Sequence, residues 1–177
     1  MMVTDYSKKE NIEQYSQKPL AYDEVLEPAF LKELGDFKNK KILDLGCGVG
    51  HLSRTLVKKG AKVTAVDPSR QMIEQAKSMS EGLKIDFRVL DGAELSELNS
   101  DEYDFVLMNM VFVNVSTVSK ATEIIDEVSR VLNEDGYFLF TDLHPISFVQ
   151  DNHETKKLPK GFDYFSNSAN YVSQVRM

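Results

Sequence analysis

Residues 41–52 read KILDLGCGVGHL, and this stretch decides the expected fold. Its first half is a short apolar run, which is typical of a buried strand. Three glycines follow at positions 46, 48 and 50. They allow a tight turn and let a ligand approach the bare backbone. Apolar residues then recur at helical spacing as far as Gly60. The stretch therefore predicts a strand, a glycine-rich turn and a helix whose first N–H groups are unpaired.

The alternation of strands and helices continues along the chain. Further strands are predicted at residues 62–66, 83–90, 103–108 and 137–141, with helices at 28–35, 68–79 and 121–132. The strands are apolar on both faces, as in parallel sheets that helices cover on both sides. We therefore expect an α/β fold with a doubly wound, mostly parallel Rossmann-like sheet and helices on both faces.

The composition is that of an acidic, folded domain. The 177 residues carry 21 Lys and Arg against 28 Asp and Glu, which gives a net charge of −7 and a pI near 5.0. This balance argues against a broad nucleic-acid footprint and favours a small-molecule or cationic partner. One cysteine excludes a disulfide within the chain and a four-cysteine metal site. No apolar run reaches the ~20 residues of a membrane helix, and the N-terminus lacks the apolar core of a signal peptide, so we expect a cytoplasmic protein.

Polar side chains follow the predicted strands, at the carboxyl ends where ligands bind in such sheets. Asp44 stands two positions before the first glycine and suits a cation, such as an amino group or a sulfonium. Asp67 ends the second strand, where a carboxylate can accept hydrogen bonds from both ribose hydroxyls of a nucleoside. Asp91 follows the third strand and is placed to meet an adenine edge, and Asn109 follows the fourth. Together these positions predict a nucleoside site.

The glycine spacing departs from the dinucleotide pattern G-x-G-x-x-G. His51 stands where that pattern has its last small residue, and a bulky side chain there disturbs close helix–strand packing. The charge of Asp44 would also repel a pyrophosphate. The chain has no catalytic Tyr-x-x-x-Lys pair. An NAD-dependent dehydrogenase is therefore the less favoured alternative.

The chain resembles class I S-adenosylmethionine-dependent methyltransferases of the small-molecule type. The matching blocks keep the order and spacing of the family and lie at residues 42–50, 66–69, 91–92, 103–106 and 131–137. The resemblance implies S-adenosylmethionine as methyl donor and S-adenosylhomocysteine as product. It also implies a cofactor site made of Asp44, Gly46, Cys47, Gly48, Asp67, Pro68, Ser69, Met72, Asp91, Gly92, Asn109 and Met110.

Each part of this implied site has a role in the family. Asp44 and the backbone of 46–48 would hold the methionine part, and Asp67 the ribose. Residues 91–92 would meet the adenine amino group, and residues 109–110 would close over the sulfonium through backbone carbonyls. Cys47 is common at its place in the family and needs no redox role. The adenine pocket would be lined by Pro68, Ser69 and Met72.

The resemblance leaves the methyl acceptor open. Residues 109–112 read Asn-Met-Val-Phe and lack the Asn/Asp-Pro-Pro-aromatic motif of base-methylating relatives, which disfavours a nucleic-acid base. A small metabolite, a tRNA or a protein could accept the methyl group, and the acidic balance favours the first. We expect methyl transfer to an O, N or C atom of a small molecule. The alternative from another class is a non-catalytic S-adenosylmethionine-binding protein.

The chain has three histidines that could serve in catalysis or metal binding. His144 follows the fifth strand and is the one candidate for a catalytic base, because an imidazole titrates near neutrality. A His-Pro turn without a catalytic role is the simpler explanation of this residue. His51 and His153 have no acidic partner in a metal-ligand pattern, so we expect no metal site.

The domain organisation follows from these blocks. We expect an N-terminal lid segment over residues 1–27, in which Tyr15 and Tyr22 are candidates to fold over the cofactor. The S-adenosylmethionine-binding Rossmann-like domain is expected over 28–145, and the start of a substrate-binding region over 146–177. One strand is expected near 171–176, but the last two strands of the family are not evident. We therefore expect that the C-terminal strands are missing or truncated, with the fifth strand at an exposed edge. The sequence leaves the oligomeric state open.

Overall fold

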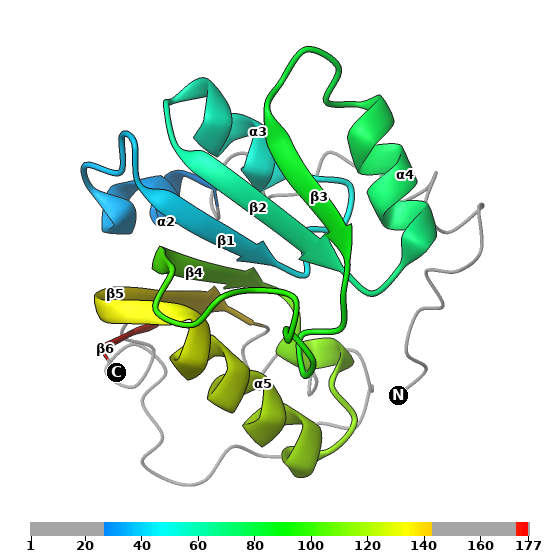
Figure 1. Cartoon of the computed structure of the whole chain (residues 1–177), viewed down its shortest axis with the longest axis vertical. Helices are drawn as coiled ribbons and strands as arrows, with labels where there is room; N and C mark the ends of the chain where they lie inside the picture. Colours follow the sequence, from blue (N-terminus) through cyan, green and yellow to red (C-terminus); the bar gives the residue numbers. More distant parts are fainter. Residues whose placement is uncertain (1–26, 143–172, 177) are drawn as a thin grey trace, which may run out of the picture.

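Strand β1 lies at the centre of a sheet with the order β3-β2-β1-β4-β5-β6 (Figure 1). The structure is a computed structural model that describes residues 27–142 and 173–176. Its strands are β1 Lys41–Leu45, β2 Lys62–Asp67, β3 Ile85–Val89, β4 Tyr103–Asn109, β5 Leu132–Thr141 and β6 Ser173–Arg176. Its helices are α2 Glu27–Leu34, α3 His51–Lys58, α4 Arg70–Ser78 and α5 Val118–Val131, with a 3-10 turn, η2, at Phe112–Asn114.

The first five strands run parallel, which confirms the expected fold class. From β1 the chain moves outward to β2 and β3, then returns past β1 to form β4 and β5. The strand order therefore reverses between β1 and β4. Leu45 at the end of β1 is in register with Val66 of β2 and Met108 of β4. The carboxyl ends of these strands form the crevice where ligands bind in open α/β sheets.

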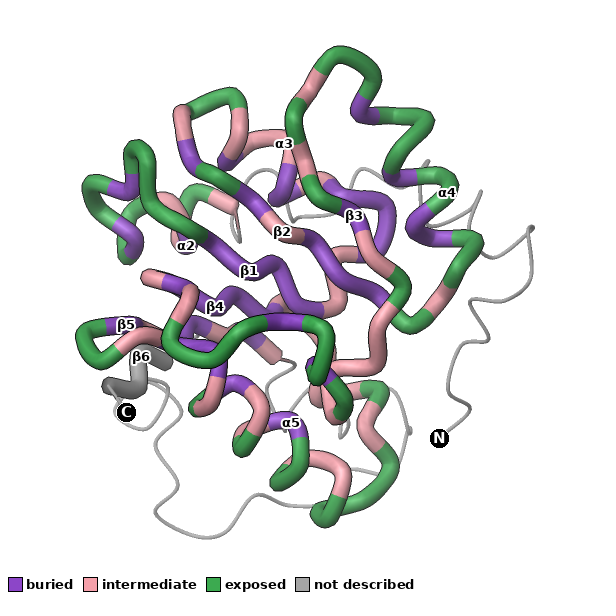
Figure 2. The backbone as a smooth tube through the Cα atoms, viewed as in Figure 1, coloured by how far each residue is buried: buried purple, intermediate pink, exposed green. Residues whose placement is uncertain are grey.

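Helices cover both faces of the sheet, as Figure 1 shows. Because side chains alternate along a strand, Ile42 packs with α2, α3 and α4 on one face, and Leu43 packs with α5 on the other. Both residues are fully buried. The central strands form the long buried stretches of Figure 2, as expected for a sheet with two apolar faces. No helix in the described part of the chain is long and apolar enough to cross a membrane.

Polar residues cap the starts of two helices, α4 as predicted and α5 three residues before its predicted start at residue 121. The Ser69 hydroxyl accepts a hydrogen bond from the Met72 N–H at 3.3 Å and caps α4. Thr117 caps α5 by accepting from the Lys120 N–H at 3.2 Å. These caps satisfy N–H groups that have no partner inside the helix. They fix where α4 and α5 leave the carboxyl side of the sheet.

The expectation that β5 lies at an exposed edge is wrong. The expected strand near residues 171–176 is present as β6, which pairs antiparallel with β5 from Tyr137 to Phe140. Its backbone occupies N–H and C=O groups that β5 would otherwise leave unpaired. Most of the predicted N-terminal lid and of the predicted substrate-binding region lies outside the described residues.

The burial of Phe138 predicts how strongly its replacement destabilises the fold. Its side chain is 1% exposed on the α5 face of the sheet, so replacing it with Ala leaves a large cavity. We expect Phe138→Ala to lower the free energy of unfolding by about 3–5 kcal/mol in urea denaturation. Val118→Ala is the control, because Val118 is 84% exposed, and its effect should stay within about 0.5 kcal/mol. Equal effects of the two changes would contradict this description of the core.

Candidate functional site

The glycine loop is bound to the end of β2. The N–H groups of Gly46 and Cys47 both donate to the Val66 carbonyl, at 2.8 and 3.0 Å. Gly46 has φ +76° and Gly48 has φ +54°, a left-handed conformation that side chains other than glycine adopt at a cost. The sequence therefore needs glycine at these two positions to fold the loop back against β2.

Asp67 at the end of β2 joins the same loop. One carboxylate oxygen accepts from the Gly48 N–H at 2.9 Å, and the other accepts from the Ser69 N–H at 2.9 Å. The residue is only 9% exposed. Burial raises the pKa of Asp67, and the two N–H donors offset part of that rise. Each oxygen keeps a further lone pair, so the carboxylate can still accept hydrogen bonds from a ligand.

Asp44 lies in β1, two residues before the loop, and is 3% exposed. It accepts a hydrogen bond from the Ser53 hydroxyl of α3. Burial raises its pKa to about 6, the Ser53 hydrogen bond opposes that rise, and the charge of Asp67 adds to it. Ser53 was not among the predicted site residues. The available signal was its position between Leu52 and Leu56 on the buried side of α3, because a buried hydroxyl needs a hydrogen-bond partner.

Cys47 is partly buried, and its Sγ lies 3.6 Å from the Gly48 carbonyl oxygen. Burial raises the pKa of the thiol far above its usual value, and the charges of Asp44 and Asp67 raise it further. The group is therefore an uncharged thiol at neutral pH, a state in which cysteine is a poor nucleophile.

A cavity of about 130 Å³ opens at the carboxyl ends of β1 to β4. Four of the predicted site residues line it, namely Gly46, Pro68, Asp91 and Gly92. The other lining residues were not predicted, and they are Leu45, Leu90, Val111, Asn114, Val115, Lys120 and Ile124. Its walls are mainly apolar, with a few polar groups. This volume is well below the ~300–1,000 Å³ of pockets for drug-sized ligands, so it suits one ring system of a larger molecule.

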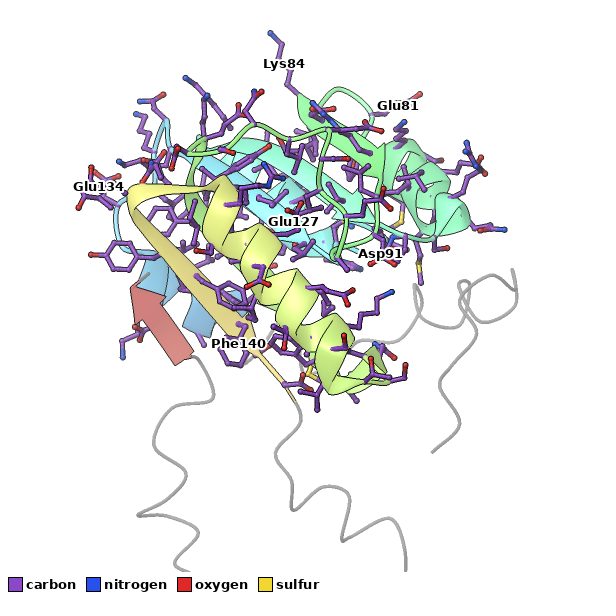
Figure 3. The ribbon with its side chains drawn as sticks, turned by 60° about the horizontal axis from the view of Figure 1, so that its bottom comes forward. Glu81, Lys84, Asp91, Glu127, Glu134 and Phe140 are labelled. Atoms are coloured by element: carbon purple, nitrogen blue, oxygen red, sulfur yellow. The ribbon has the colours of Figure 1, made fainter. Side chains whose placement is uncertain are left out.

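Asp91 and Lys120 bring opposite charges together at this cavity. The Lys120 Nζ donates to one carboxylate oxygen of Asp91 at 2.6 Å, and the Ala93 N–H donates to the other at 3.0 Å. Partial burial acts to raise the pKa of Asp91, but these hydrogen bonds and the Lys120 charge outweigh it and lower the pKa. Figure 3 labels Asp91 beside α5, the helix that carries Lys120. Nothing in the sequence near Lys120 pointed to this pairing.

Asn109, Met110 and Met72 were also predicted for the site, but they do not line the cavity. The Asn109 side chain accepts from the Thr141 hydroxyl of β5. Met110 has φ +57°, and its carbonyl accepts from the Asn114 amide at 3.3 Å. Met72 is 3% exposed inside α4 and packs in the core. Among the predicted adenine-pocket residues, Pro68 alone lines the cavity, while Ser69 caps α4.

Several predictions concern residues outside the described part of the chain. These are the catalytic candidate His144 and the lid candidates Tyr15 and Tyr22. Within residues 27–142 and 173–176, no group of three or more His, Cys, Asp or Glu side chains could hold a metal ion.

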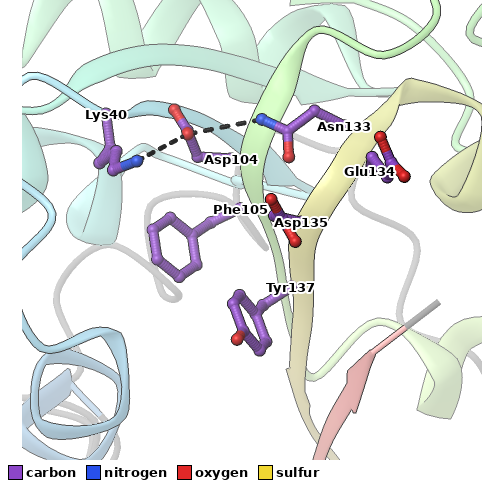
Figure 4. Close-up of a pocket in the computed structure, with 7 residues that line it drawn as sticks. All are labelled: Lys40, Asp104, Phe105, Asn133, Glu134, Asp135 and Tyr137. Atoms are coloured by element: carbon purple, nitrogen blue, oxygen red, sulfur yellow. Dashed lines mark hydrogen bonds and ion pairs between the residues drawn. The ribbon is translucent and has the colours of Figure 1, made fainter.

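A larger cavity of about 370 Å³ lies at the opposite, amino-terminal ends of β1 and β4 (Figure 4). Its polar side chains pair with one another, since Asp104 accepts from Lys40 at 2.9 Å and from Asn133 at 3.4 Å. Phe105 and Tyr137 stack on its apolar side with ring centroids 6.0 Å apart. This cavity lies away from the glycine loop and from the strand ends where ligands bind in this fold, so we do not assign the site to it.

The residues at the carboxyl ends fit a nucleoside with a charged tail. The small apolar cavity suits a flat heteroaromatic ring, and Asp91 offers an ionised acceptor at its rim. Asp67 offers a second buried acceptor beside the loop. Asp44 adds a third carboxylate, and a cationic group would offset the unfavourable burial of these charges.

Comparison with known families agrees with this geometry. Residues 42–136 match the family described as methyltransferase domain. The chain belongs to this family. The matched segment begins in β1 and ends within β5, and it contains the glycine loop, Asp67 and Asp91.

Individual relatives support the same assignment. A ubiquinone biosynthesis O-methyltransferase of Hydrogenovibrio crunogenus is 29% identical over 118 residues, covering 65% of this chain and 47% of the relative. The crystal structure of a SAM-dependent methyltransferase from Methanosarcina mazei is 28% identical, with a TM-score of 0.58, and covers 63% of this chain and 55% of the other. The crystal structure of a protein from Pyrococcus horikoshii OT3 is 29% identical, with a TM-score of 0.66. The match covers 79% of this chain and 69% of the other.

These findings confirm the resemblance to class I S-adenosylmethionine-dependent methyltransferases. They support S-adenosylmethionine as the cofactor and methyl transfer as the kind of activity. The chain spans about half the length of the Hydrogenovibrio relative and of the Methanosarcina structure.

Substitutions in the glycine loop can separate the backbone cost of a positive φ from the cost of a steric clash. A Cβ on Gly46 would clash with the Val111 Cγ2, and φ of Gly46 is +76°. Gly82 has nearly the same φ, +79°, but nothing within 4 Å of its Cβ position. We expect Gly82→Ala to lower the free energy of unfolding by about 1–2 kcal/mol through the backbone alone. Gly46→Ala should cost a further ~1–3 kcal/mol through the clash.

Chemical denaturation of both variants measures this difference. Adding Val111→Ala to Gly46→Ala should recover the steric part and leave a loss close to that of Gly82→Ala. A Gly46→Ala variant no less stable than Gly82→Ala would contradict the close contact between the loop and Val111.

Proposed function

We propose that this protein is an S-adenosylmethionine-dependent methyltransferase that transfers a methyl group to an oxygen atom of a small molecule. The observation that carries the proposal is the hydrogen bond that joins the Gly48 N–H to the Asp67 carboxylate beside the cavity. It brings the two cofactor motifs of the sequence to one point, at the reversal of strand order.

Each described part of the site has a proposed role toward the cofactor. Asp67 accepts hydrogen bonds from the ribose hydroxyls, and the cavity bounded by Pro68 and Gly92 takes the adenine ring. Asp91 accepts from the adenine amino group. Asp44 favours the cationic end of the methionine part through its charge. Further contributions are proposed for Gly46, Cys47, Gly48, Ser69, Met72, Asn109 and Met110.

The chemistry needs little from the protein beyond alignment. S-adenosylmethionine supplies a methyl group that is already activated by the positive charge on sulfur. The chain holds donor and acceptor in line, which by itself lowers the barrier substantially. The carbonyls of Asn109 and Met110 are proposed to help hold the methyl group through weak C–H···O contacts. An acceptor that must lose a proton needs a base, and His144 is the proposed candidate.

Two observations support a small-molecule oxygen acceptor. Several relatives bear the name ubiquinone biosynthesis O-methyltransferase, including that of Hydrogenovibrio crunogenus. The net charge of −7 disfavours a nucleic acid as acceptor. Nitrogen and carbon acceptors remain the alternatives, and the cytoplasm is the proposed location.

Binding and transfer can be tested separately. Thermal stabilisation by S-adenosylhomocysteine but not by NAD would support the cofactor and exclude the dehydrogenase alternative. Methyl transfer from labelled S-adenosylmethionine would then be measured with small phenols, amines and activated carbon acids. Transfer to phenols supports the proposed acceptor. Binding without transfer to any acceptor would favour the non-catalytic alternative.

Asp67 is the residue whose loss should weaken cofactor binding most clearly. Removal of a buried, charged acceptor should reduce S-adenosylhomocysteine affinity about ten- to a hundredfold in Asp67→Ala, measured by calorimetry. Circular dichroism and denaturation should establish that the variant is folded. Asp86→Ala is the matched control, because Asp86 is an exposed carboxylate that pairs with Arg88 outside the site. Unchanged affinity in Asp67→Ala would remove this residue from the proposed site.

The pH dependence of binding follows from Asp44. Its pKa of about 6 means that the carboxyl becomes protonated as the pH falls below 6. The α-amino group of the cofactor, with an ordinary pKa of about 7.7–8.0, stays positive over the same range. Binding of that cation should favour ionised Asp44, so affinity for S-adenosylhomocysteine should weaken about tenfold from pH 7.5 to pH 5.

Asp44→Asn tests the origin of this effect. The variant should bind more weakly at pH 7.5 and show a flatter pH profile, with only the part that Asp67 contributes remaining. Asp67 also has a raised pKa and acts electrostatically on Asp44, so Asp67→Asn is measured beside it. A wild-type profile that is flat between pH 5 and 7.5 would contradict the proposed role of Asp44.

A further inference from the structure

The ion pair between Lys120 and Asp91 lies on the lining of the small cavity. Lys120 comes from the first turn of α5, and Asp91 from the turn after β3. Their side-chain atoms meet at 2.6 Å, and both residues border the cavity together with Pro68 and Gly92. The charged groups therefore occupy the rim of the space proposed for the cofactor ring.

The pair fixes the orientation of the Asp91 carboxylate. Lys120 holds one oxygen, and the Ala93 N–H holds the other at 3.0 Å. Lys120 is itself placed at the start of α5, where its N–H donates to the Thr117 cap. Two donors from different elements thus hold the carboxylate in one rotamer, with its unused lone pairs free to accept from a ligand.

Stability alone does not account for this pair. Its side chains are 42% and 40% exposed, and ion pairs with such exposure contribute little to folding. Helix α5 is already bound to the segment after β3 near its other end. There Glu127, which Figure 3 labels, accepts from the Leu95 N–H at 2.7 Å. Arg130 donates to the Leu95 and Leu98 carbonyls at 2.8 and 3.0 Å.

We propose that Lys120 is a positioning residue that holds Asp91 as the acceptor for the exocyclic amino group of the purine. It thereby sets the preference for adenine over a purine with a carbonyl at that position. The inference rests on the proposed cofactor. An ionised carboxylate accepts from an amino group but repels a carbonyl oxygen.

The test compares two ligands that differ at this one group. S-adenosylhomocysteine carries the amino group, and S-inosylhomocysteine carries a carbonyl in its place. Calorimetry on the wild-type protein should give an affinity ratio of about ten- to a hundredfold in favour of the adenosyl ligand. Lys120→Met should lower this ratio at least about threefold by weakening adenosyl binding, because the Asp91 carboxylate is no longer held toward the amino group. Lys120→Arg keeps a donor to Asp91 and should restore most of the ratio.

Controls separate positioning from a general structural effect. Lys77→Met removes a lysine from the exposed side of α4, away from the cavity lining, and should leave both affinities unchanged. A purely structural role of Lys120 would weaken both ligands equally and leave their ratio intact, which would overturn the inference. An unaltered ratio in Lys120→Met, in a wild-type background that binds S-adenosylhomocysteine, overturns the inference alone. Failure of the wild-type protein to bind S-adenosylhomocysteine overturns the proposed function and this inference together.

Discussion

The attachment of the glycine loop to the end of β2 is the constraint on which the rest of the site depends. Gly46 and Cys47 donate to the Val66 carbonyl, and Gly48 donates to the Asp67 carboxylate. These N–H groups and this carboxylate are largely buried, so each would cost free energy if it were left without a partner. Satisfying them together fixes the loop, the start of α3 and the orientation of Asp67. The site is therefore organised before a ligand arrives, which limits the entropy lost on binding.

Charge is the second organising feature. Asp44 and Asp67 are both buried near the same loop. Burial raises the pKa of each carboxyl, and the charge of Asp67 raises the pKa of Asp44 further. A protein does not gain stability from such an arrangement, because burial penalises the charged form. Buried carboxylates with raised pKa values are typical of functional sites. A cationic ligand would offset the unfavourable burial of their charge. The third acid, Asp91, differs in having its own cation, Lys120, and its pKa is lowered instead.

The residues proposed to bind the cofactor lie in the described part of the chain, whereas most of those proposed for the acceptor lie outside it. The parts that concern the cofactor lie at the carboxyl ends of β1 to β4 and within the matched family segment. The parts proposed for the acceptor and for proton removal fall mainly on residues outside the described ranges, such as His144. The fold thus supports a cofactor and a class of reaction, whereas the acceptor proposal depends on the relatives and on overall charge. This matches the general behaviour of Rossmann-like folds, which carry many functions on one scaffold.

The order of the strands and helices and the motifs of the cofactor site can be predicted from the sequence. Strands and helices have different periods of apolar residues. Gly46 and Gly48 have positive φ, which glycine adopts most easily, so both features can be recognised in the sequence without knowledge of tertiary contacts. Tertiary structure alone decided which distant residues meet. Ser53 reaches Asp44 because α3 packs back onto the sheet, Lys120 reaches Asp91 across 29 residues, and β6 pairs with β5 after an even longer interval. Such pairings depend on how elements pack in space, and no local pattern records them.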